Sequence, residues 1–548
     1  MNLFTDIRVF ILENIQIQMG SKKLQVWLPL LFSMVMVLGM FIGYQLNERT
    51  SGSNFLKGSK KTSIQELMDL IRTKYVDPVK TDSINALAID EILSHLDPHS
   101  SYIPAIELKD LNEDLMGNFQ GIGVEFQMFN DTLNIINVIK NGPSEKAGLM
   151  VGDKIIAVND SINITGKNIN ADAIRKYLRG PGGTKVNVSF IRKGNKISTS
   201  IIRGTIPVST IDAAYVIAPL TGYIKINKFG DKTYEEFMEN LEKLQKQGIQ
   251  KLILDLRGNG GGLMAEATDI ADEFLAGDKL IVYTQGDKSK RYEYKTKRDG
   301  LFEKGKLVLL VDETSASASE VLTGALQDWD RATIVGRRTF GKGLVQQQFT
   351  LSDGSAVRLT IARYYTPLGR NIQKPYTNKT KKEYQEELLE RYNHGEMAKA
   401  DTITHTGVSF KTLGGHIVYG GGGITPDIFV AADTSKMAKE VAKLYYKYTL
   451  SNFVYNYYIQ NQSYFKTIKD PVELSKQFNP QEKEWRELEF YAKKDSIDLS
   501  HINSKDKMQL LQKMQALMSK QMFRNEGYFE TSNMNDSIVQ KALILIKE

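Results

Sequence analysis

Residues 308–330 read VLLVDETSASASEVLTGALQDWD, in which an apolar strand passes through a turn of small residues into a helix. Apolar residues recur along that helix at the spacing of one face: Val321, Leu322, Ala325 and Leu326. Around this segment, strand-like runs such as LILDL at 252–256 alternate with helical runs. The alternation predicts a mixed α/β core over residues 207–436.

Ser317 is predicted to lie at the entrance of this helix. The first turn of a helix has unpaired backbone N–H groups and the positive end of the helix dipole, which stabilise an oxyanion developing beside a serine. Serine is also a common helix cap, so Ser315, Ser317 and Ser319 also fit a plain helix start. This segment alone leaves a nucleophile and a cap as alternatives.

A candidate general base follows in FGKGLVQQ at residues 340–347. The glycines that flank Lys342 leave room for its side chain to approach another backbone. If this segment is extended, Lys342, Leu344 and Gln346 share one face, and Gln346 can orient the amine. A lysine acts as a base only when neutral, and partial burial lowers its pKa toward that state. The alternative is a solvated surface lysine, which is the commoner fate of this residue type.

A glycine cluster ends the strand in LILDLRGNGGGL at residues 252–263. The backbone N–H of Gly260 or Gly261 is a candidate second donor to an oxyanion. A plain strand-to-helix turn fits the same residues. Asp255 raises the alternative of an aspartic protease, but it lies inside a strand pattern and no second matching motif is present.

The composition excludes several kinds of site. The 548 residues include 71 Lys+Arg and 64 Asp+Glu, a net charge of +7 without a long basic run, which disfavours nucleic acid as a partner. The absence of cysteine excludes disulfides, zinc–thiolate sites and cysteine nucleophiles. The six histidines lack HExxH spacing, so neither a metal nor an organic cofactor is expected. His95 and His99 flank an Asp-Pro turn and are interpreted as structural.

The N-terminal region contains an uncharged apolar run at residues 26–44, VWLPLLFSMVMVLGMFIGY, which has the length of a membrane-spanning helix. Lys22 and Lys23 precede it and are expected to stay in the cytoplasm, which directs the rest of the chain to the outer side. A cleaved signal peptide is the alternative, but no small-x-small cleavage site follows the run. We therefore expect an uncleaved anchor in the bacterial inner membrane, with the catalytic part in the periplasm.

The length exceeds what one hydrophobic core usually organises, so several domains are expected. The patterns divide the chain into a cytoplasmic N-terminus at 1–24, a transmembrane anchor at 25–45, a linker at 46–61, a helical region at 62–111, a mostly β domain at 112–206, the α/β core at 207–436 and a helical extension at 437–548. The extension shows no recognisable chemistry.

An ordered set of motifs resembles the carboxyl-terminal processing peptidases, also called tail-specific proteases. The motifs are LDPHSSYI at 96–103, GIGVEF at 121–126, DLRGNGGG at 255–262, SASASE at 315–320, QDWDRA at 327–332, FGKGLVQ at 340–346, ARYYTPLGRNIQKP at 362–375 and GGGITPD at 421–427. The resemblance covers roughly residues 62–436 and is specific, because SASASE and FGKG follow each other at the family's spacing.

The resemblance implies a crotonase-like α/β protease core whose nucleophile is Ser317 and whose general base is Lys342, supported by Gln346. It implies oxyanion donors at Ala318 and at Gly260 or Gly261, and Asp328 matches an acidic position of the family with a structural role.

The same resemblance makes the β domain a PDZ module, which binds extended C-termini by strand addition and holds the terminal carboxylate in a backbone nest. The residues that would hold the carboxylate are Gly121, Ile122, Gly123 and Val124. Apolar substrate tails are the expected preference.

Residues and resemblance together predict a membrane-anchored serine endopeptidase that recognises the C-terminal tails of protein substrates and cleaves them through an acyl-enzyme in the cell envelope. An adaptor or a second copy of the chain is compatible as a further partner. The alternatives are a catalytically silent PDZ scaffold or chaperone, and an enzyme of another class on a related core, such as a hydratase or thioesterase. The sequence shows no phosphate-binding loop, which argues against an enzyme of another class.

Overall fold

The computed structural model describes residues 29–30, 32–41, 62–129, 131–159, 162–166, 171–400, 407–435 and 437–547. The chain divides into two compact units, residues 1–85 and 86–548. In the first unit the described residues at 29–30 and 32–41 are helical, and α3 (Ser63–Lys74) begins with a capping box between Thr62 and Gln65. α4 (Thr81–Ser94) begins at the end of this unit.

Much of the predicted N-terminal organisation lies outside the described residues. This holds for the cytoplasmic segment 1–24, for linker 46–61 and for both ends of the anchor 25–45. Among the residues that the structure describes, no helix has both the length and the apolar character needed to span a bilayer.

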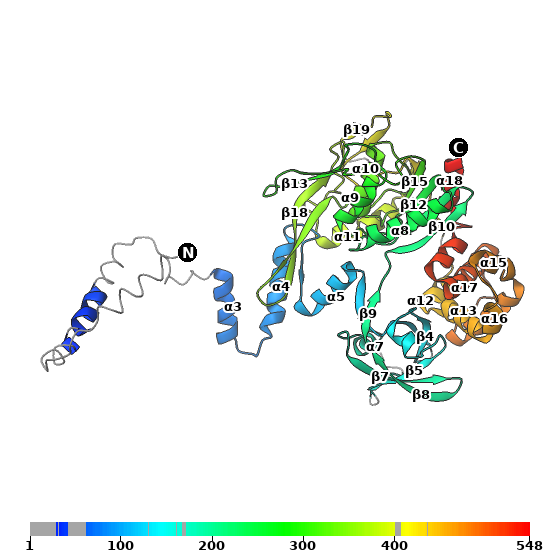
Figure 1. Ribbon diagram of the computed structural model, residues 1–548, viewed down its shortest axis with the longest axis horizontal. Helices are drawn as coiled ribbons and strands as arrows, with labels where there is room; N and C mark the ends of the chain where they lie inside the picture. The colour runs from blue at the N-terminus through cyan, green and yellow to red at the C-terminus, as the bar shows by residue number, and fades with distance from the viewer. Residues whose placement is uncertain are drawn as a thin grey trace, which may run out of the picture. The chain divides into compact units, whose positions relative to one another are not determined.

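The α/β core is built on a six-stranded sheet of order β10 (Ile211–Ala218), β11 (Thr221–Ile226), β12 (Lys251–Asp255), β15 (Lys306–Val311), β16 (Thr333–Gly336) and β21 (Ile428–Phe429). From β11 onward the neighbouring strands are parallel, and β10 pairs antiparallel with β11 (Figure 1). The predicted α/β core is confirmed.

Apolar side chains alternate between the two faces of this sheet. Leu252, Leu254 and Leu309 belong to the core formed with α8 (Thr233–Lys246), α9 (Met264–Asp272) and α10 (Ala318–Asp328). Ile253 and Val308 lie in a second core that includes apolar residues of α18 (Ser537–Lys547). Both faces of a parallel sheet must be packed against other elements. Because α18 covers one of them, the end of the C-terminal extension is an integral layer of the core.

A second sheet lies beside the first and has the order β1 (Ser101–Ile103), β18 (Ala356–Tyr365), β13 (Leu280–Gln285) and β14 (Tyr292–Lys295), with β17 (Leu344–Thr350) paired to β18. The remaining core elements are α11 (Lys381–Asn393) and the hairpin of β19 (Ser409–Lys411) and β20 (Ile417–Tyr419).

The β domain contains an antiparallel sheet of order β3 (Val124–Phe129), β4 (Thr132–Val138), β5 (Lys154–Val158), β7 (Lys185–Arg192) and β8 (Asn195–Ile202), with β6 (Ile162–Asn163) on β5. Strands β2 (Asn118–Gly121) and β9 (Gly204–Pro207) pair at the domain entrance, and its helices are α6 (Pro143–Lys146) and α7 (Ala171–Leu178). Helix α5 (Ala105–Leu115) precedes the domain. Because β3 is an edge strand, it can accept a further strand.

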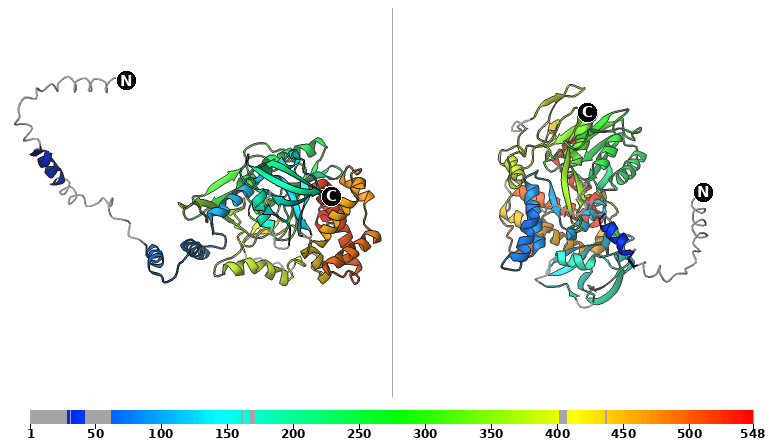
Figure 2. Two further views of the ribbon diagram at one scale, coloured as in Figure 1. Left: turned by 90° about the horizontal axis from the view of Figure 1, so that it is seen from below. Right: turned by 90° about the vertical axis from the view of Figure 1, so that its left-hand side faces the viewer.

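The C-terminal extension is helical, as predicted, and has its own apolar core around Leu444, Phe465, Trp485 and Met514. Its elements are α12 (Lys439–Tyr446), α13 (Thr449–Gln460), α14 (Gln462–Phe465), α15 (Pro471–Gln477), α16 (Glu482–Ala492), η2 (Lys493–Asp495), α17 (Ser504–Ser532) and α18. Figure 2 shows these orange and red helices packed against the rest of this unit from two further directions.

The extension contacts the β domain and the core alike. Tyr455 stacks on Phe129 of β3 with ring centroids 4.9 Å apart and donates a hydrogen bond to the Ile135 carbonyl at 3.2 Å. On the core side, the side-chain amide of Asn525 donates to Asp212 at 2.7 Å. The extension therefore connects the β domain to the core.

Candidate active site

Ser317 occupies a sharp turn between β15 and α10. Its backbone angles, φ 56° and ψ −116°, lie in a region that residues with a side chain rarely adopt. Such a conformation persists only where the surroundings enforce it, and it is common at catalytic serines on strand-to-helix turns. Ser317 immediately precedes the first residue of α10, as the sequence predicted.

Glu320 holds the turn and the lysine segment together. Its carboxylate is fully buried and accepts hydrogen bonds from the backbone N–H of Ser317 at 2.9 Å and of Lys342 at 2.8 Å. It also accepts from the Gly341 N–H at 2.8 Å and the Thr339 hydroxyl at 2.5 Å. Burial raises the pKa of Glu320, while these donors act in the opposite direction. A single carboxylate thus fixes both candidate catalytic segments.

The Lys342 amine donates a hydrogen bond to Gln346 Oε1 at 2.8 Å, and the Gln346 amide donates to the His99 carbonyl at 2.7 Å. Burial, together with the nearby charge of Arg358, lowers the pKa of Lys342 below its ordinary value. This environment is the one that the sequence predicted for a general base, with Gln346 orienting the amine.

Tyr364 and His99 also support this arrangement, although no sequence pattern indicated that role. The Tyr364 hydroxyl donates to the Lys342 carbonyl at 2.5 Å and to the Ser317 carbonyl at 3.2 Å. His99, interpreted as structural, supplies the carbonyl that holds Gln346, and its ring contacts the Tyr384 hydroxyl at 2.9 Å. Burial and the charge of Lys342 lower the pKa of His99 to about 4, which keeps the ring neutral.

The glycine cluster packs directly against the serine. A Cβ on Gly261 would lie 2.7 Å from the Ser317 Cβ, and one on Gly262 would lie 2.0 Å from the Phe229 carbonyl oxygen. The Gly261 N–H already donates to Asn259 Oδ1 at 2.9 Å. Ala318 is the first residue of α10, so the helix offers its N–H no carbonyl. Of the predicted oxyanion donors, Ala318 and Gly260 therefore fit best.

A cleft of about 600 Å³ contains all six residues predicted for the reaction. They are Ser317, Lys342, Gln346, Ala318, Gly260 and Gly261. A larger cavity of about 880 Å³ lies elsewhere, between residues such as Asp330, His416 and Leu545, and includes none of the six. The convergence of serine, lysine and backbone donors identifies the smaller cleft as the candidate active site.

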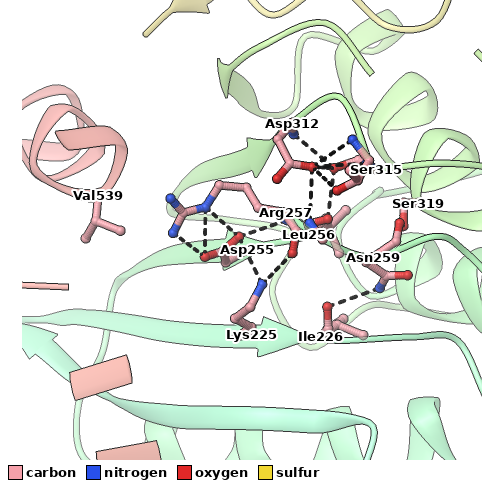
Figure 3. A network of polar contacts seen from close by, with 12 residues as sticks. Lys225, Ile226, Asp255, Leu256, Arg257, Asn259, Asp312, Ser315, Ser319 and Val539 are labelled. Carbon is pink, nitrogen blue, oxygen red and sulfur yellow. Dashed lines mark hydrogen bonds and ion pairs between the residues drawn. The ribbon is translucent and has the colours of Figure 1, made fainter. Parts of the chain in front are cut away.

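Asp255 is excluded as a catalytic acid by its partners, of which Figure 3 shows Arg257 and Lys225. Its carboxylate accepts from the Tyr223 hydroxyl at 2.7 Å and from Arg257 at 2.6 Å, and it lies 3.5 Å from the Lys225 amine. Although burial alone raises its pKa, Arg257 and Lys225 hold the pKa of Asp255 well below its ordinary value. Asp255 is thus a permanently charged structural anion.

Asp328 has a structural role. Its carboxylate forms a fully buried ion pair with Arg370 at 2.5 Å and accepts from the Leu368 N–H at 2.9 Å. Among the residues that the structure describes, no group of three His, Asp or Glu side chains is arranged to hold a metal ion.

The predicted carboxylate loop borders a small apolar pocket of about 100 Å³ in the β domain. The pocket is lined by Phe119, Ile122, Gly123, Val124, Phe126, Arg175, Leu178 and Arg179. Three of the four predicted residues line it, while Gly121 is buried beside them at the end of β2. The two arginines come from α7 and the segment after it, and no sequence motif indicated that they would line this pocket.

Comparisons with known proteins match two parts of this chain to described families. The family model described as Peptidase family S41 matches residues 220–381, and the model described as PDZ domain matches residues 120–202. A probable CtpA-like serine protease of Staphylococcus epidermidis is 35% identical over 346 residues, which cover 63% of this chain and 69% of the relative. A carboxy-terminal-processing protease of Bartonella bacilliformis is 35% identical over 315 residues, covering 56% and 71%.

A solved structure, titled photosystem II D1 C-terminal processing protease, is 26% identical to this chain. The similarity covers 68% of this chain and 88% of that one, with a TM-score of 0.36.

The contact between Gly261 and Ser317 predicts a sharp difference between neighbouring glycines. Gly261→Ala forces its Cβ into the serine turn at a φ of +97°, whereas a Cβ on Gly260 meets no atom within 4 Å. We expect Gly261→Ala to slow the labelling of Ser317 by a fluorophosphonate by about a hundredfold or more. Gly260→Ala is the matched control and should change the rate by less than about threefold. Equal rates in the two variants would contradict this packing.

Proposed function

This chain belongs to peptidase family S41 and is a C-terminal processing serine protease with a PDZ domain, and from this premise we propose that Ser317 and Lys342 form its catalytic dyad. The observation that carries the proposal is the buried Glu320 carboxylate, which binds the backbone of both residues at the edge of one cleft. A serine at a strained helix entrance and a lysine with a lowered pKa are the two groups that acyl transfer needs.

The proposed reaction begins when the neutral Lys342 amine accepts the hydroxyl proton of Ser317. The serine oxygen then bonds to the peptide carbonyl carbon, and the oxyanion accepts hydrogen bonds from the N–H groups of Gly260 and Ala318. The C–N bond breaks, the leaving amine takes the proton from Lys342, and an acyl-enzyme remains. Water, deprotonated by Lys342, releases the acyl group in the same way.

We propose that the PDZ domain delivers the substrate's C-terminus. A tail that adds to the free edge of β3 places its carboxylate at the backbone of residues 121–124. The floor of the adjoining pocket is apolar, with Ile122, Phe126 and Leu178, which favours an apolar last residue. The substrate class is therefore proteins and peptides with free apolar C-termini.

A catalytically silent scaffold is the alternative function. It would also use the PDZ pocket. It would need neither a lowered pKa at Lys342 nor the hydrogen bond between Lys342 and Gln346. The intact arrangement favours the protease.

We further propose that the apolar run at residues 26–44 anchors the chain in the bacterial inner membrane, with the catalytic part in the periplasm. Lys22 and Lys23 precede the run, which favours this orientation. Its described apolar side chains are 51–68% exposed: Leu30, Phe32, Met34, Val35, Met36, Val37, Leu38, Met40 and Phe41.

The first test compares residues 46–548 with its Ser317→Ala and Lys342→Ala variants on an unfolded protein that ends in apolar residues. Each variant should cleave at least about a thousandfold more slowly, because neither can form the acyl-enzyme. Blocking the substrate's C-terminus should reduce cleavage by the unmodified protein. Ser352→Ala, on the exposed surface, is the control. Cleavage that persists in Ser317→Ala would refute the dyad, and tail binding without any cleavage would favour the scaffold.

The second test is the pH dependence of kcat. Since Lys342 must be neutral, activity should rise with pH, with a midpoint below the ordinary lysine pKa of 10.5. Gln346→Glu places a carboxylate against the ammonium, stabilises the charged form and raises the pKa of Lys342, so the midpoint should move to higher pH. Gln347→Glu puts the same charge on the neighbouring, solvent-exposed side chain of β17, where water screens it, and should move the midpoint less. Identical profiles in both variants would show that Lys342 is not the titrating base.

The third test concerns the anchor. The full chain, expressed in bacteria, should stay in the membrane fraction after alkaline carbonate extraction, whereas residues 46–548 should be released. In spheroplasts, added protease should reach the catalytic part. A full chain found in the soluble fraction, or a catalytic part protected in intact spheroplasts, would contradict the proposed location.

A further inference from the structure

We propose that Asp536, in the C-terminal extension, is a positioning residue. It binds Arg257 and thereby fixes the glycine loop of the candidate active site, residues 257–262. The inference rests on the proposed function of Ser317, and it gives a catalytic reason for an extension that the sequence left without a role. It follows from a series of polar contacts that begins at Asp536 and ends at residues on both sides of Ser317. Figure 3 shows the middle of this series, with Arg257, Asn259 and Ser315.

The series begins with a cluster of four charged side chains next to the start of the glycine loop. Asp536 accepts hydrogen bonds from one guanidinium nitrogen of Arg257 at 2.8 and 3.0 Å, while another nitrogen donates to Asp255 at 2.6 Å. The Lys225 amine lies 3.5 Å from Asp255. The side chains of Lys225, Asp255 and Arg257 are at most 15% exposed, and that of Asp536 is 29% exposed. Two cations and two anions balance, and Asp536 supplies one of the anions.

The cluster fixes the backbone where the glycine loop begins. The Arg257 N–H donates to Asp255 Oδ1 at 2.9 Å, and the Lys225 amine donates to the Arg257 carbonyl at 2.6 Å. The next residue, Gly258, donates its N–H to Asp312 at 3.1 Å. The position of the Arg257 main chain is therefore set by the same groups that bind its side chain.

From this point the loop is bonded to the serine turn. The Ser315 hydroxyl donates to the Leu256 carbonyl at 2.9 Å. The Asn259 carbonyl accepts from the Ala316 N–H at 3.0 Å and from the Ser319 hydroxyl at 2.9 Å. A shift of residues 256–259 would thus move the residues on both sides of Ser317.

The loop also sets the position of the proposed oxyanion donor at Gly260. The side-chain oxygen of Asn259 holds the Gly261 N–H, and Gly261 packs against the Ser317 side chain. The Gly260 N–H lies between these fixed residues. A small shift of a preorganised donor or nucleophile lowers the rate of the chemical step more than it lowers substrate binding.

Asp536 reaches Arg257 because helix α18 packs under the sheet. Its carboxylate also caps this helix, accepting from the N–H groups of Ile538 at 2.9 Å and Val539 at 3.0 Å. Val539 is fully buried in the core shared with Ile253 and Val308. Loss of the Asp536 charge leaves an excess positive charge beside the loop even if the helix stays in place.

The test separates this positioning role from simple stabilisation. Asp536→Asn removes the charge but keeps a good helix cap. Asp470→Asn is the matched control, because Asp470 caps α15 of the same extension at 2.7 Å from the Glu473 nitrogen. In residues 46–548, we expect Asp536→Asn to lower kcat on the tailed substrate about tenfold, and the rate of fluorophosphonate labelling by the same factor. KM and the thermal midpoint should stay close to those of Asp470→Asn.

A double-mutant comparison shows whether the effect passes through Arg257. In an Arg257→Gln background, Asp536→Asn should lower kcat no further. An unchanged kcat in Asp536→Asn, a loss equal to that in Asp470→Asn, or full additivity with Arg257→Gln would overturn the proposal. Failure of the proposed function is recognised separately, because Ser317→Ala would then retain activity.

Discussion

The geometry of the candidate active site depends on the buried carboxylate of Glu320. Four donors converge on it, among them the backbone N–H groups of Ser317 and Lys342, which lie in different segments of the core. A buried anion is tolerable only when such donors satisfy it, so the carboxylate and the two segments require each other. The strained backbone of Ser317 persists because this network and the packed glycine loop leave it no alternative.

Around this centre the sheet supports catalysis from both faces. On one face α10 carries the serine, and on the other α18 brings Asp536 to the start of the glycine loop. The same extension holds the PDZ domain through Tyr455 and the core through Asn525. The PDZ domain and the α/β core are therefore joined by a helical extension that lies beyond both matched family segments.

Local sequence was sufficient for the α/β core and for the position of Ser317 at a helix entrance, because small-residue turns and glycine clusters restrict the backbone in recognisable ways. The PDZ domain and the full set of cleft residues were predicted from the family resemblance. Glu320 was visible within SASASE, yet its role depends on a lysine segment 22 residues away. Asp536 was beyond prediction, since 279 residues separate it from Arg257 and no local pattern encodes that pairing. The resemblance predicted the carboxylate loop at residues 121–124, but it did not indicate Arg175 and Arg179, which line the same pocket from a distant segment of the chain.

In the proposed dyad, burial favours the neutral amine of Lys342 and Gln346 orients it. The most direct measurement is the titration of the Lys342 side chain by NMR in isotopically labelled Ser317→Ala protein, with the signal assigned by Lys342→Arg. We expect the pKa of Lys342 to lie below the ordinary 10.5, because burial disfavours the ammonium. A pKa at or above 10.5 would contradict it, since the amine would then remain charged when the serine must lose its proton.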